Sequence, residues 1–438
     1  MRRRILVISS DAVGASMAGG GIRAYELARA LAPHADVTLA GLPSVSAHEL
    51  DLRVVTYDLN DPRALRQPIA TSDVIVAQPQ WPPVMRWMKR SGARLIFDMY
   101  VPELFEVFES WAERRTAVRG LVASLVTDRL MHAFHIGHHF LCASDRQRDL
   151  WLGAMLAERV VTPKLLERDP GLNRTIAKVP FGVPDETAAG TGAAGLRDRF
   201  PEIGPDDPVA LWNGGLWGWL DPLTVIRAMG EVAGRLPGAR LVFMGKATHR
   251  QAERATQEAR ELAGGLGLLD RTVFFNDVWV PYADRANWLL DADCAVSAHH
   301  EHLETRFAFR TRLLDCFWAG LPIICTEGDD LADRVELDDL GATVQPGDVN
   351  GMARAIEQVL GRGRTSYQPA LRRVAADHAW SVVTEPLVRF ALEPGPTPRL
   401  GMLTTPQRPG QMARGIAFRV ARATLNRTGL RHWPGGPE

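Results

Sequence analysis

The sequence has 438 residues, with 51 basic and 51 acidic side chains and an apolar fraction of 46%. At roughly 100 to 200 residues per domain, this length predicts two domains. The balanced charge gives no reason to expect a nucleic acid partner. The cysteines lie in apolar stretches without metal-ligand spacing and are interpreted as buried thiols; they are Cys142, Cys294, Cys316 and Cys325.

The N-terminal segment MRRRILVISS is basic and then apolar, but its apolar run is only as long as a strand. Asp11 follows it where a signal peptide would have a cleavage site of small residues, so no signal peptide is predicted. No stretch approaches the about 18 uninterrupted apolar residues of a membrane-spanning helix. These features favour a soluble, cytoplasmic protein.

The first half of the sequence alternates strand and helix patterns. A short apolar run at 5–10 leads into a glycine-rich stretch at 14–21 and then into a helical pattern. A second helix, apolar on one side, is predicted over 118–130. This alternation predicts a parallel sheet covered by helices on both faces. Further strands are predicted at 35–41, 51–59, 72–78, 93–100 and 138–144.

The alternation of strand and helix patterns begins again after residues 180–195, whose Pro, Gly and small residues predict a linker. A covering helix is predicted over 351–360. We therefore expect an N-terminal Rossmann-like domain at 1–185 and a C-terminal one at 196–380. The strands of the second domain are predicted at 208–215, 239–245, 271–276, 294–299 and 321–326.

Residues 381–438 are predicted to form a C-terminal extension with a crossover helix and a basic tail. The last part is rich in Pro, Gly and Arg, and a helix is predicted over 411–426. The arginines of this helix are scattered around its circumference, which favours a surface helix or a loose tail over a membrane anchor. We expect at most a weak, salt-sensitive peripheral contact with an anionic membrane.

Two glycine loops follow predicted strands at equivalent places in the two domains. Gly20 and Gly21 precede the first helix, where free N–H groups favour an anion such as a diphosphate. Gly214 and Gly215 lie in the matching segment of the second domain. Neither loop has the G-x-G-x-x-G pattern, which disfavours a nicotinamide cofactor. A tight turn without a ligand is the alternative.

Charged side chains crowd residues 297–330, between a predicted strand and the helix that follows it. Core packing does not explain these charges. Carboxylates accept hydrogen bonds from sugar hydroxyls, and arginines neutralise diphosphates. A solvated surface of ion pairs is the alternative. The charged residues are Glu304, Arg306, Arg310, Arg312 and Asp315.

The order Glu304, Phe309, Arg310, Asp315 and then AGLP at 319–322 resembles the donor-binding signature of the family 4 retaining glycosyltransferases, here of bacterial type. The resemblance spans most of residues 4–390 and includes the glycine loop, FGVPDE at 181–186 and the run that begins at Val278. It implies the α/β GT-B fold, with two Rossmann-like domains facing each other across a cleft, the acceptor held by the first and the donor by the second.

The resemblance also implies roles for single residues. Glu304 would bind the transferred sugar and Asp315 the ribose, although Asp315 follows Glu304 by eleven positions, more than is usual in the family. The Arg and Lys that the family places after the first strand of the second domain are absent here, where the sequence has Gly214, Gly215, Leu216 and Trp217. Arg310 and Arg312 are the predicted catalytic replacements, which would stabilise the departing diphosphate. Lys246 and Arg306 are the next candidates for this role.

Asp98 is the third predicted catalytic residue, because it ends a strand at a position where relatives often carry a His near the reacting carbon. It could orient or deprotonate the acceptor hydroxyl, or merely cap the next segment. The full set of predicted donor contacts is Gly20, Gly21, Gly214, Gly215, Lys246, Val278, Glu304, Arg306, Phe309 and Asp315.

The sequence therefore predicts a hexosyltransferase-like enzyme that moves a sugar from a nucleotide-diphosphate sugar to a glycan, a lipid-linked acceptor or another small molecule. The nucleotide sugar is a co-substrate, and no further cofactor is expected. No metal site is predicted either, because the histidines at 299, 300 and 302 lack a ligand set with metal spacing. A sugar-nucleotide epimerase or phosphorylase of the same fold and a catalytically inactive GT-B binding protein are the alternatives.

Overall fold

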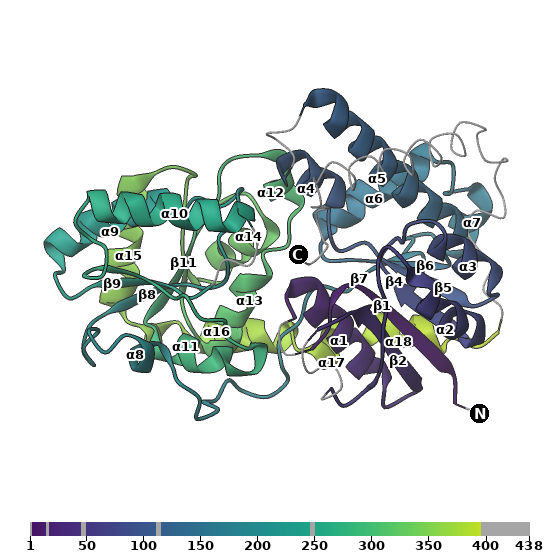
Figure 1. Ribbon diagram of the computed structural model, residues 1–438, viewed down its shortest axis with the longest axis horizontal. Coiled ribbons are helices and arrows are strands. Elements are labelled where there is room, and N and C mark those ends of the chain that lie inside the picture. Colours follow the sequence, from purple (N-terminus) through teal and green to yellow (C-terminus); the bar gives the residue numbers. More distant parts are fainter. Residues whose placement is uncertain (1, 15–16, 45–49, 111–114, 246–249, 396–438) are drawn as a thin grey trace. The chain divides into compact units, whose positions relative to one another are not determined.

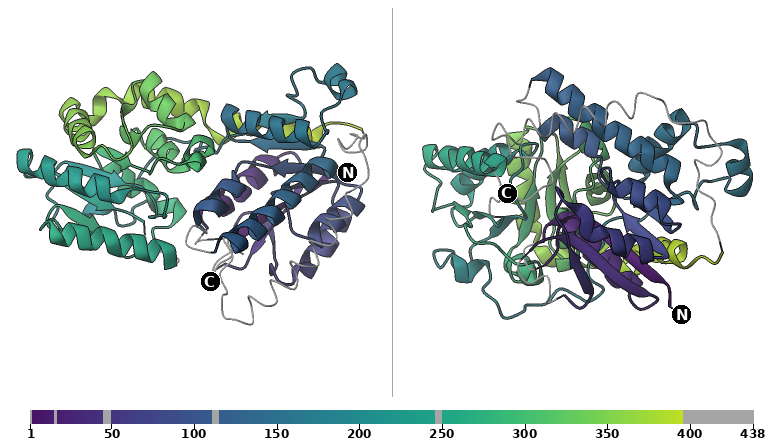
Figure 2. Two further views of the ribbon diagram at one scale, coloured as in Figure 1. Left: turned by 90° about the horizontal axis from the view of Figure 1, so that it is seen from above. Right: turned by 45° about the vertical axis from the view of Figure 1, so that its right-hand side comes forward.

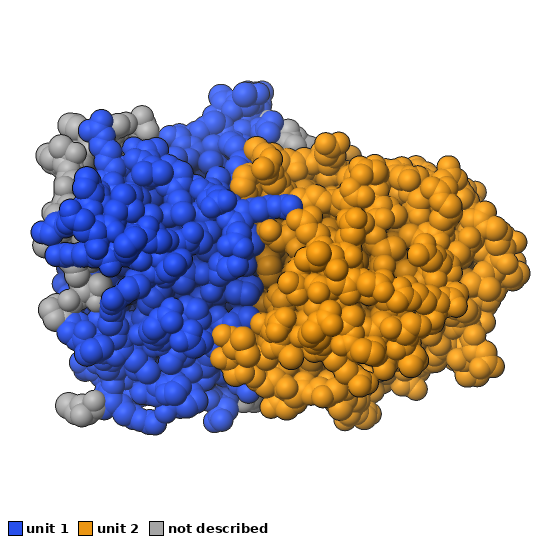
Figure 3. All heavy atoms as spheres, turned by 180° about the vertical axis from the view of Figure 1, so that it is seen from behind, with its two compact units in different colours: residues 1–180, 383–438 blue, residues 181–382 orange. Residues whose placement is uncertain are grey.

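The computed structural model describes residues 2–14, 17–44, 50–110, 115–245 and 250–395. The chain forms two compact units, coloured separately in Figure 3. Unit 1 consists of Met1–Pro180 together with Val383–Glu438, and unit 2 consists of Phe181–Val382. The first unit therefore combines the N-terminal part of the chain with Glu385–Leu392, the last helix among the described residues.

Unit 1 is built on a seven-stranded parallel sheet with the strand order β3-β2-β1-β4-β5-β6-β7. The inner strands are almost completely buried, as expected for a parallel sheet covered on both faces. The strands are β1 (Arg4–Ala12), β2 (Asp36–Leu42), β3 (Arg53–Thr56), β4 (Val74–Ala77), β5 (Arg94–Asp98), β6 (His139–Cys142) and β7 (Ile176–Lys178).

Helices cover both faces of this sheet (Figures 1 and 2). Apolar side chains of α2, α3, α5 and α6 form one core with the sheet, whereas α1 and α18 pack on the other face. The helices are α1 (Gly19–Leu31), the 3-10 turn η2 (Pro62–Leu65), α2 (Arg66–Thr71), α3 (Val84–Arg90), α4 (Glu103–Ser110), α5 (Thr116–Ile136), α6 (Asp145–Ala157), α7 (Pro163–Arg168) and α18 (Glu385–Leu392).

Helix α18 returns the chain to the first unit. The guanidinium of Arg94 donates hydrogen bonds to the carbonyls of Phe390 and Glu393 at 2.8 and 2.7 Å. The ring of Phe390 also stacks on His139, with centroids 4.2 Å apart. These contacts tie α18 to strands β5 and β6. The helix predicted over 411–426 lies outside the described residues.

Unit 2 repeats the pattern with a six-stranded parallel sheet in the order β10-β9-β8-β11-β12-β13. The central strands are again buried along their whole length. The strands are β8 (Val209–Trp212), β9 (Arg240–Phe243), β10 (Val273–Phe275), β11 (Cys294–Ser297), β12 (Ile323–Thr326) and β13 (Gly341–Val344).

The helices of unit 2 lie on both faces of its sheet (Figure 1). Helices α9, α10 and α15 pack on one face, and α8, α11, α13 and α16 on the other. Their bounds are α8 (Leu196–Arg199), α9 (Pro222–Arg235), α10 (Arg250–Gly265), η3 (Tyr282–Asp284), α11 (Arg285–Asp291), α12 (Leu303–Phe307), α13 (Thr311–Ala319), α14 (Asp330–Leu337), α15 (Val349–Arg362), η4 (Arg364–Ser366), α16 (Gln368–Asp377) and α17 (Trp380–Val383).

The predicted strands are all present, and the structure adds β7 and β13, which the sequence analysis did not identify. The predicted linker at 180–195 has no helix or strand, only an isolated bridge from Val183 to Ala379. All four cysteines are buried free thiols, as predicted, and burial raises the pKa of Cys142 and Cys316 to about 12. Over the described ranges, no helix is both long and apolar enough to span a bilayer.

Candidate functional site

In each sheet the strand order reverses beside the first strand, between β1 and β4 in unit 1 and between β8 and β11 in unit 2. Doubly wound sheets bind their ligands at the carboxyl ends of the strands at such a switch point. In unit 2 the two loops that leave this point are linked by hydrogen bonds. The N–H of Asp221 donates to the Ala298 carbonyl at 2.9 Å, and the N–H of His300 donates to the Trp219 carbonyl at 3.2 Å.

The loop after β8 depends on two glycines. Gly214 has φ +95°, a left-handed conformation that favours glycine. Gly245 follows β9, and a Cβ at this position would overlap the backbone of Gly214. The backbones of the two loops therefore lie in direct contact. Lys246, a predicted donor contact, is the next residue and lies outside the described residues.

Arg312 reaches this loop from helix α13. Its Nη2 donates to the Gly215 carbonyl at 3.1 Å, and its guanidinium lies 5.7 Å from the ring centre of Trp212. The side-chain amide of Asn213 donates to the Arg312 carbonyl at 2.8 Å, which fixes the start of the helix. The structure thus brings the predicted residues Gly214, Gly215 and Arg312 together.

The charge of Arg312 has no counter-ion among the described residues. Its Nη1 is buried and makes no hydrogen bond. Burial and the neighbouring charge of Arg310 lower the pKa of Arg312 to about 9. The N-terminus of helix α13 adds a partial positive charge here. No side-chain cap and no acidic residue in the first turn compensate this charge. This arrangement favours an anion.

Arg310 has a different environment. It is 8% exposed, and its Nη2 donates to Glu304 Oε2 at 3.0 Å and to Thr305 Oγ1 at 3.2 Å. Its Nε is buried without a hydrogen bond, 3.7 Å from Asp329 Oδ2. Asp329 itself caps helix α14. Arg310 therefore neutralises two buried carboxylates, a role that the sequence analysis did not foresee.

The other predicted donor contacts are spread around this cluster. Glu304 is 3% exposed and lies in the short helix α12. Arg306 on the same helix is exposed, whereas Phe309 is partly buried. Val278 is 53% exposed, and its backbone is held by Asn276, whose side chain bonds both its N–H and its carbonyl.

Asp315 projects from α13 and is bound by a residue that the sequence analysis missed. Arg285 Nε donates to Asp315 Oδ1 at 2.9 Å. The guanidinium of Arg285 also lies over the rings of Tyr282 and Trp318, at 3.6 and 4.5 Å from their centres. In the sequence, the signal for this contact is Tyr282, three positions before Arg285, because Asp315 and Trp318 come from helix α13.

In unit 1 the predicted catalytic residue Asp98 forms a buried ion pair. Arg23 Nε and Nη2 donate to its two carboxylate oxygens at 2.6 and 2.8 Å. The two side chains are only 1% and 7% exposed. Tyr100 covers the pair, with its ring centre 4.4 Å from the Arg23 guanidinium carbon.

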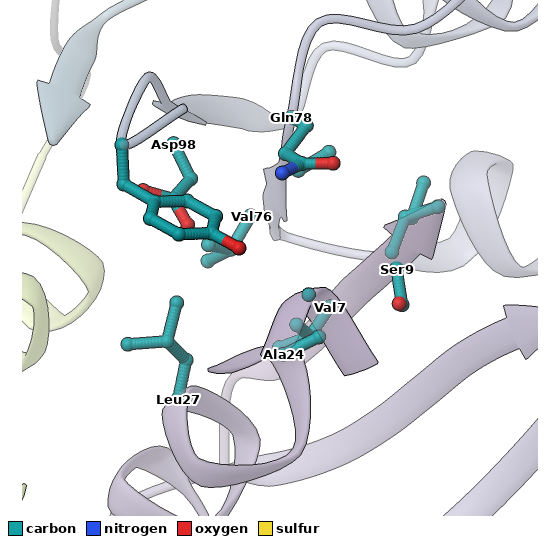
Figure 4. A pocket seen from close by; sticks show the side chains of 11 residues that line it. Val7, Ser9, Ala24, Leu27, Val76, Gln78 and Asp98 are labelled. Carbon is teal, nitrogen blue, oxygen red and sulfur yellow. The ribbon is translucent and has the colours of Figure 1, made fainter. Parts of the chain in front are cut away.

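A small pocket lies beside this pair at the carboxyl ends of β1, β4 and β5. Figure 4 shows Asp98 and Gln78 on one side of the pocket and Ala24 and Leu27 of α1 on the other. Gly20 also lines it. A Cβ on Gly20 would overlap the carboxylate of Asp11, and a Cβ on Gly21 would overlap the Ala12 carbonyl. Both glycines thus let helix α1 begin close to the end of β1.

No group of three or more side chains able to hold a metal ion occurs in the part of the chain that the structure describes. The histidines near the site make other contacts. His299 Nδ1 lies 3.2 Å from the His300 carbonyl, and His302 caps helix α12 by accepting from the Thr305 N–H.

The two Rossmann-like halves have the architecture of the GT-B class. Residues 207–362, all within unit 2, match the family described as glycosyl transferases group 1. The match covers most of unit 2 and about a third of the chain. No curated protein matches the sequence.

Solved structures match almost the whole chain. HepE of Anabaena, in complex with UDP and glucose, has a TM-score of 0.65 at 12% identity over 88% of this chain and 98% of its own. A glycosyltransferase of Rickettsia africae has a TM-score of 0.62 at 14% identity, over 90% of this chain and 100% of its own. A UDP-forming trehalose-phosphate synthase of Burkholderia xenovorans has a TM-score of 0.60 at 15% identity, over 88% of this chain and 99% of its own. This likeness shows that the fold is GT-B, as expected from the resemblance.

Proposed function

We propose that this chain is a glycosyltransferase that moves a sugar, in the manner of a hexosyltransferase, from a nucleotide-diphosphate sugar to an acceptor hydroxyl. The observation that carries the proposal is Arg312, a cation without a counter-ion among the described residues, placed at the switch point of the group 1 domain. A diphosphate would supply the missing negative charge.

In the proposed mechanism the donor lies on unit 2. Arg312 and the N-terminus of α13 hold the diphosphate, and the oxygen of Asp315 that Arg285 does not bind accepts a ribose hydroxyl. Glu304 accepts a hydroxyl of the transferred sugar. The bond from the sugar to the phosphate breaks, and Arg312 stabilises the charge that develops on the departing diphosphate. The acceptor hydroxyl attacks the same face, and its proton passes to the departing phosphate oxygen.

We propose that this course of reaction retains the anomeric configuration, as in the bacterial family 4 enzymes that the sequence resembles. Arginine supplies the positive charge, so the mechanism uses no metal and no cofactor besides the nucleotide sugar. We propose a cytoplasmic enzyme with at most a weak peripheral contact with the membrane, acting on a glycan, a lipid-linked molecule or a small molecule. The UDP in the HepE complex makes UDP the first nucleotide to test.

The test is binding of UDP, ADP, GDP and TDP to the full chain by isothermal titration calorimetry. We expect one of them to bind and Arg312→Ala to weaken this binding about 10-fold to 100-fold, as loss of a charge-assisted hydrogen bond does. Arg354→Ala is the matched control, because Arg354 is exposed on α15 and outside the proposed site. Unchanged affinity in Arg312→Ala, or no binding of any nucleotide to the wild type, would refute the proposal.

A further inference from the structure

Unit 1 contains two carboxylates at the carboxyl ends of β1 and β5, the strands on either side of β4, and only one of them has a partner among the described residues. Both oxygens of Asp98 accept hydrogen bonds from Arg23. An acceptor hydroxyl would have to compete with a buried bidentate ion pair for them. Asp98 is therefore poorly placed to bind a substrate.

Asp11 is the other carboxylate and is the second-to-last residue of β1, beside the switch point between β1 and β4. It is only partly exposed. Its backbone N–H donates to Ser9 Oγ at 3.0 Å, but within the described residues its carboxylate makes no hydrogen bond or ion pair. Burial raises the pKa of Asp11 to about 6, with no basic side chain opposing the change.

Among the described residues, no basic side chain lowers the pKa of Asp11. Gly20 of α1 lies against its carboxylate and leaves room for no larger residue. Tyr57 follows β3 and Tyr100 follows β5, and the charge of Asp11 adds to burial in raising the pKa of both hydroxyls. Arg23 and Asp98 also face Tyr100, but they neutralise each other.

This charge distribution decides which ligand the glycine loop of unit 1 can take. The sequence analysis expected a diphosphate at Gly20 and Gly21. A carboxylate beside Gly20 that has no counter-ion among the described residues would repel a diphosphate, whereas it would accept a hydrogen bond from a neutral hydroxyl. The adjoining pocket contributes further polar groups from Ser9 and Gln78 and an apolar wall from α1.

We propose that Asp11 is the acceptor-binding carboxylate of unit 1 and takes a hydrogen bond from the attacking hydroxyl of a neutral sugar or similar polyol. This inference deepens the proposed function and rests on it. Asp11 does not remove the proton, which passes to the departing phosphate oxygen; it orients the hydroxyl. The role that the sequence analysis gave to Asp98 thus moves to Asp11.

The experiment measures binding of neutral monosaccharides, namely glucose, mannose and N-acetylglucosamine, to the full chain by saturation-transfer NMR. We expect saturable binding of at least one sugar at pH 7.5 and a loss of about tenfold or more in Asp11→Asn. The affinity for the nucleotide diphosphate should stay within about twofold in this variant, because the donor contacts lie on unit 2. In the wild type, sugar affinity should also fall as the pH drops below about 6.

Asp36→Asn is the matched control, since Asp36 is exposed at the amino end of the neighbouring strand β2. Gly20→Ala is a second variant, in which the new methyl group displaces the Asp11 carboxylate, and it should lose the same sugar affinity. The inference is overturned if no sugar binds the wild type, or if Asp11→Asn binds sugar as well as the wild type does. Either result leaves the nucleotide test of Arg312 unaffected, so the two proposals fail separately.

Discussion

Arg23 binds both carboxylate oxygens of Asp98, with Nε and Nη2 at 2.6 and 2.8 Å, and the two residues lie 75 positions apart in the sequence. The same guanidinium donates to the carbonyls of Val179 and Pro180, which follow β7. The ion pair and these hydrogen bonds thus connect helix α1, strand β5 and the segment that follows the edge strand β7. Removing one member of a buried pair leaves an uncompensated charge.

We therefore predict that Asp98→Asn lowers the free energy of unfolding by about 3 to 5 kcal/mol, measured by urea denaturation. The Arg23→Gln, Asp98→Asn double variant should lose less than the sum of the two single losses, because the members of a pair are coupled. Asp36→Asn serves as the control for a surface carboxylate. Stability close to that of the wild type together with lost sugar transfer would instead support the catalytic role that the sequence suggested for Asp98.

We predict that substitution of Arg310 lowers the free energy of unfolding more than substitution of Arg312 does. Arg310→Met removes the guanidinium that neutralises the buried carboxylates of Glu304 and Asp329 and should cost about 3 to 5 kcal/mol of unfolding free energy. Adding Glu304→Gln should recover a large part of this loss. Arg312→Ala removes no ion pair among the described residues and should unfold at nearly the urea concentration of the wild type. If Arg310→Met keeps its stability but no longer binds a nucleotide diphosphate, Arg310 contacts the phosphate directly.

Gly245→Ala tests the contact between the two loops of unit 2. Its Cβ would overlap the backbone of Gly214 and push the β8 loop away from Arg312. We expect lower stability and weaker nucleotide binding, both measured in the same thermal-shift series. Gly361→Ala, in helix α15 with open space around it, should instead stabilise by about 0.5 to 1 kcal/mol. Equal behaviour of the two variants would show that the loop contact is unimportant.

The sequence predicted the fold better than the contacts within the site. Continuous apolar runs such as VALW in β8 are visible without a structure, whereas β7 and β13 include Lys178 and Gly341, which weaken the strand pattern. Charge at 304–315 was also visible. The ion-pair partners of these charged side chains could not be predicted, because Asp329, which pairs with Arg310, and Arg285, which pairs with Asp315, come from other elements. Which carboxylate keeps a free oxygen depends on such tertiary contacts and not on spacing.

The pH dependence of stability gives a last prediction, on Asp11. Burial raises its pKa from 3.8 to about 6. The folded state therefore holds the proton more tightly than the unfolded state, so raising the pH from about 4 to 6 removes stability from the wild type. Below this window Asp11 is protonated in both states, and above it Asp11 is ionised in both.

Asp11→Asn lacks this ionisation. The variant should therefore match the wild type near pH 4 and become more stable than the wild type as the pH rises to 6, with a constant gain of about 1 to 3 kcal/mol above that. Urea denaturation of both proteins at several pH values measures the difference, in which all other titrating groups cancel. A gain in stability that accompanies a loss of sugar binding is typical of a residue kept for function. A variant that is less stable than the wild type at pH 7 would show that the Asp11 carboxylate has a stabilising partner.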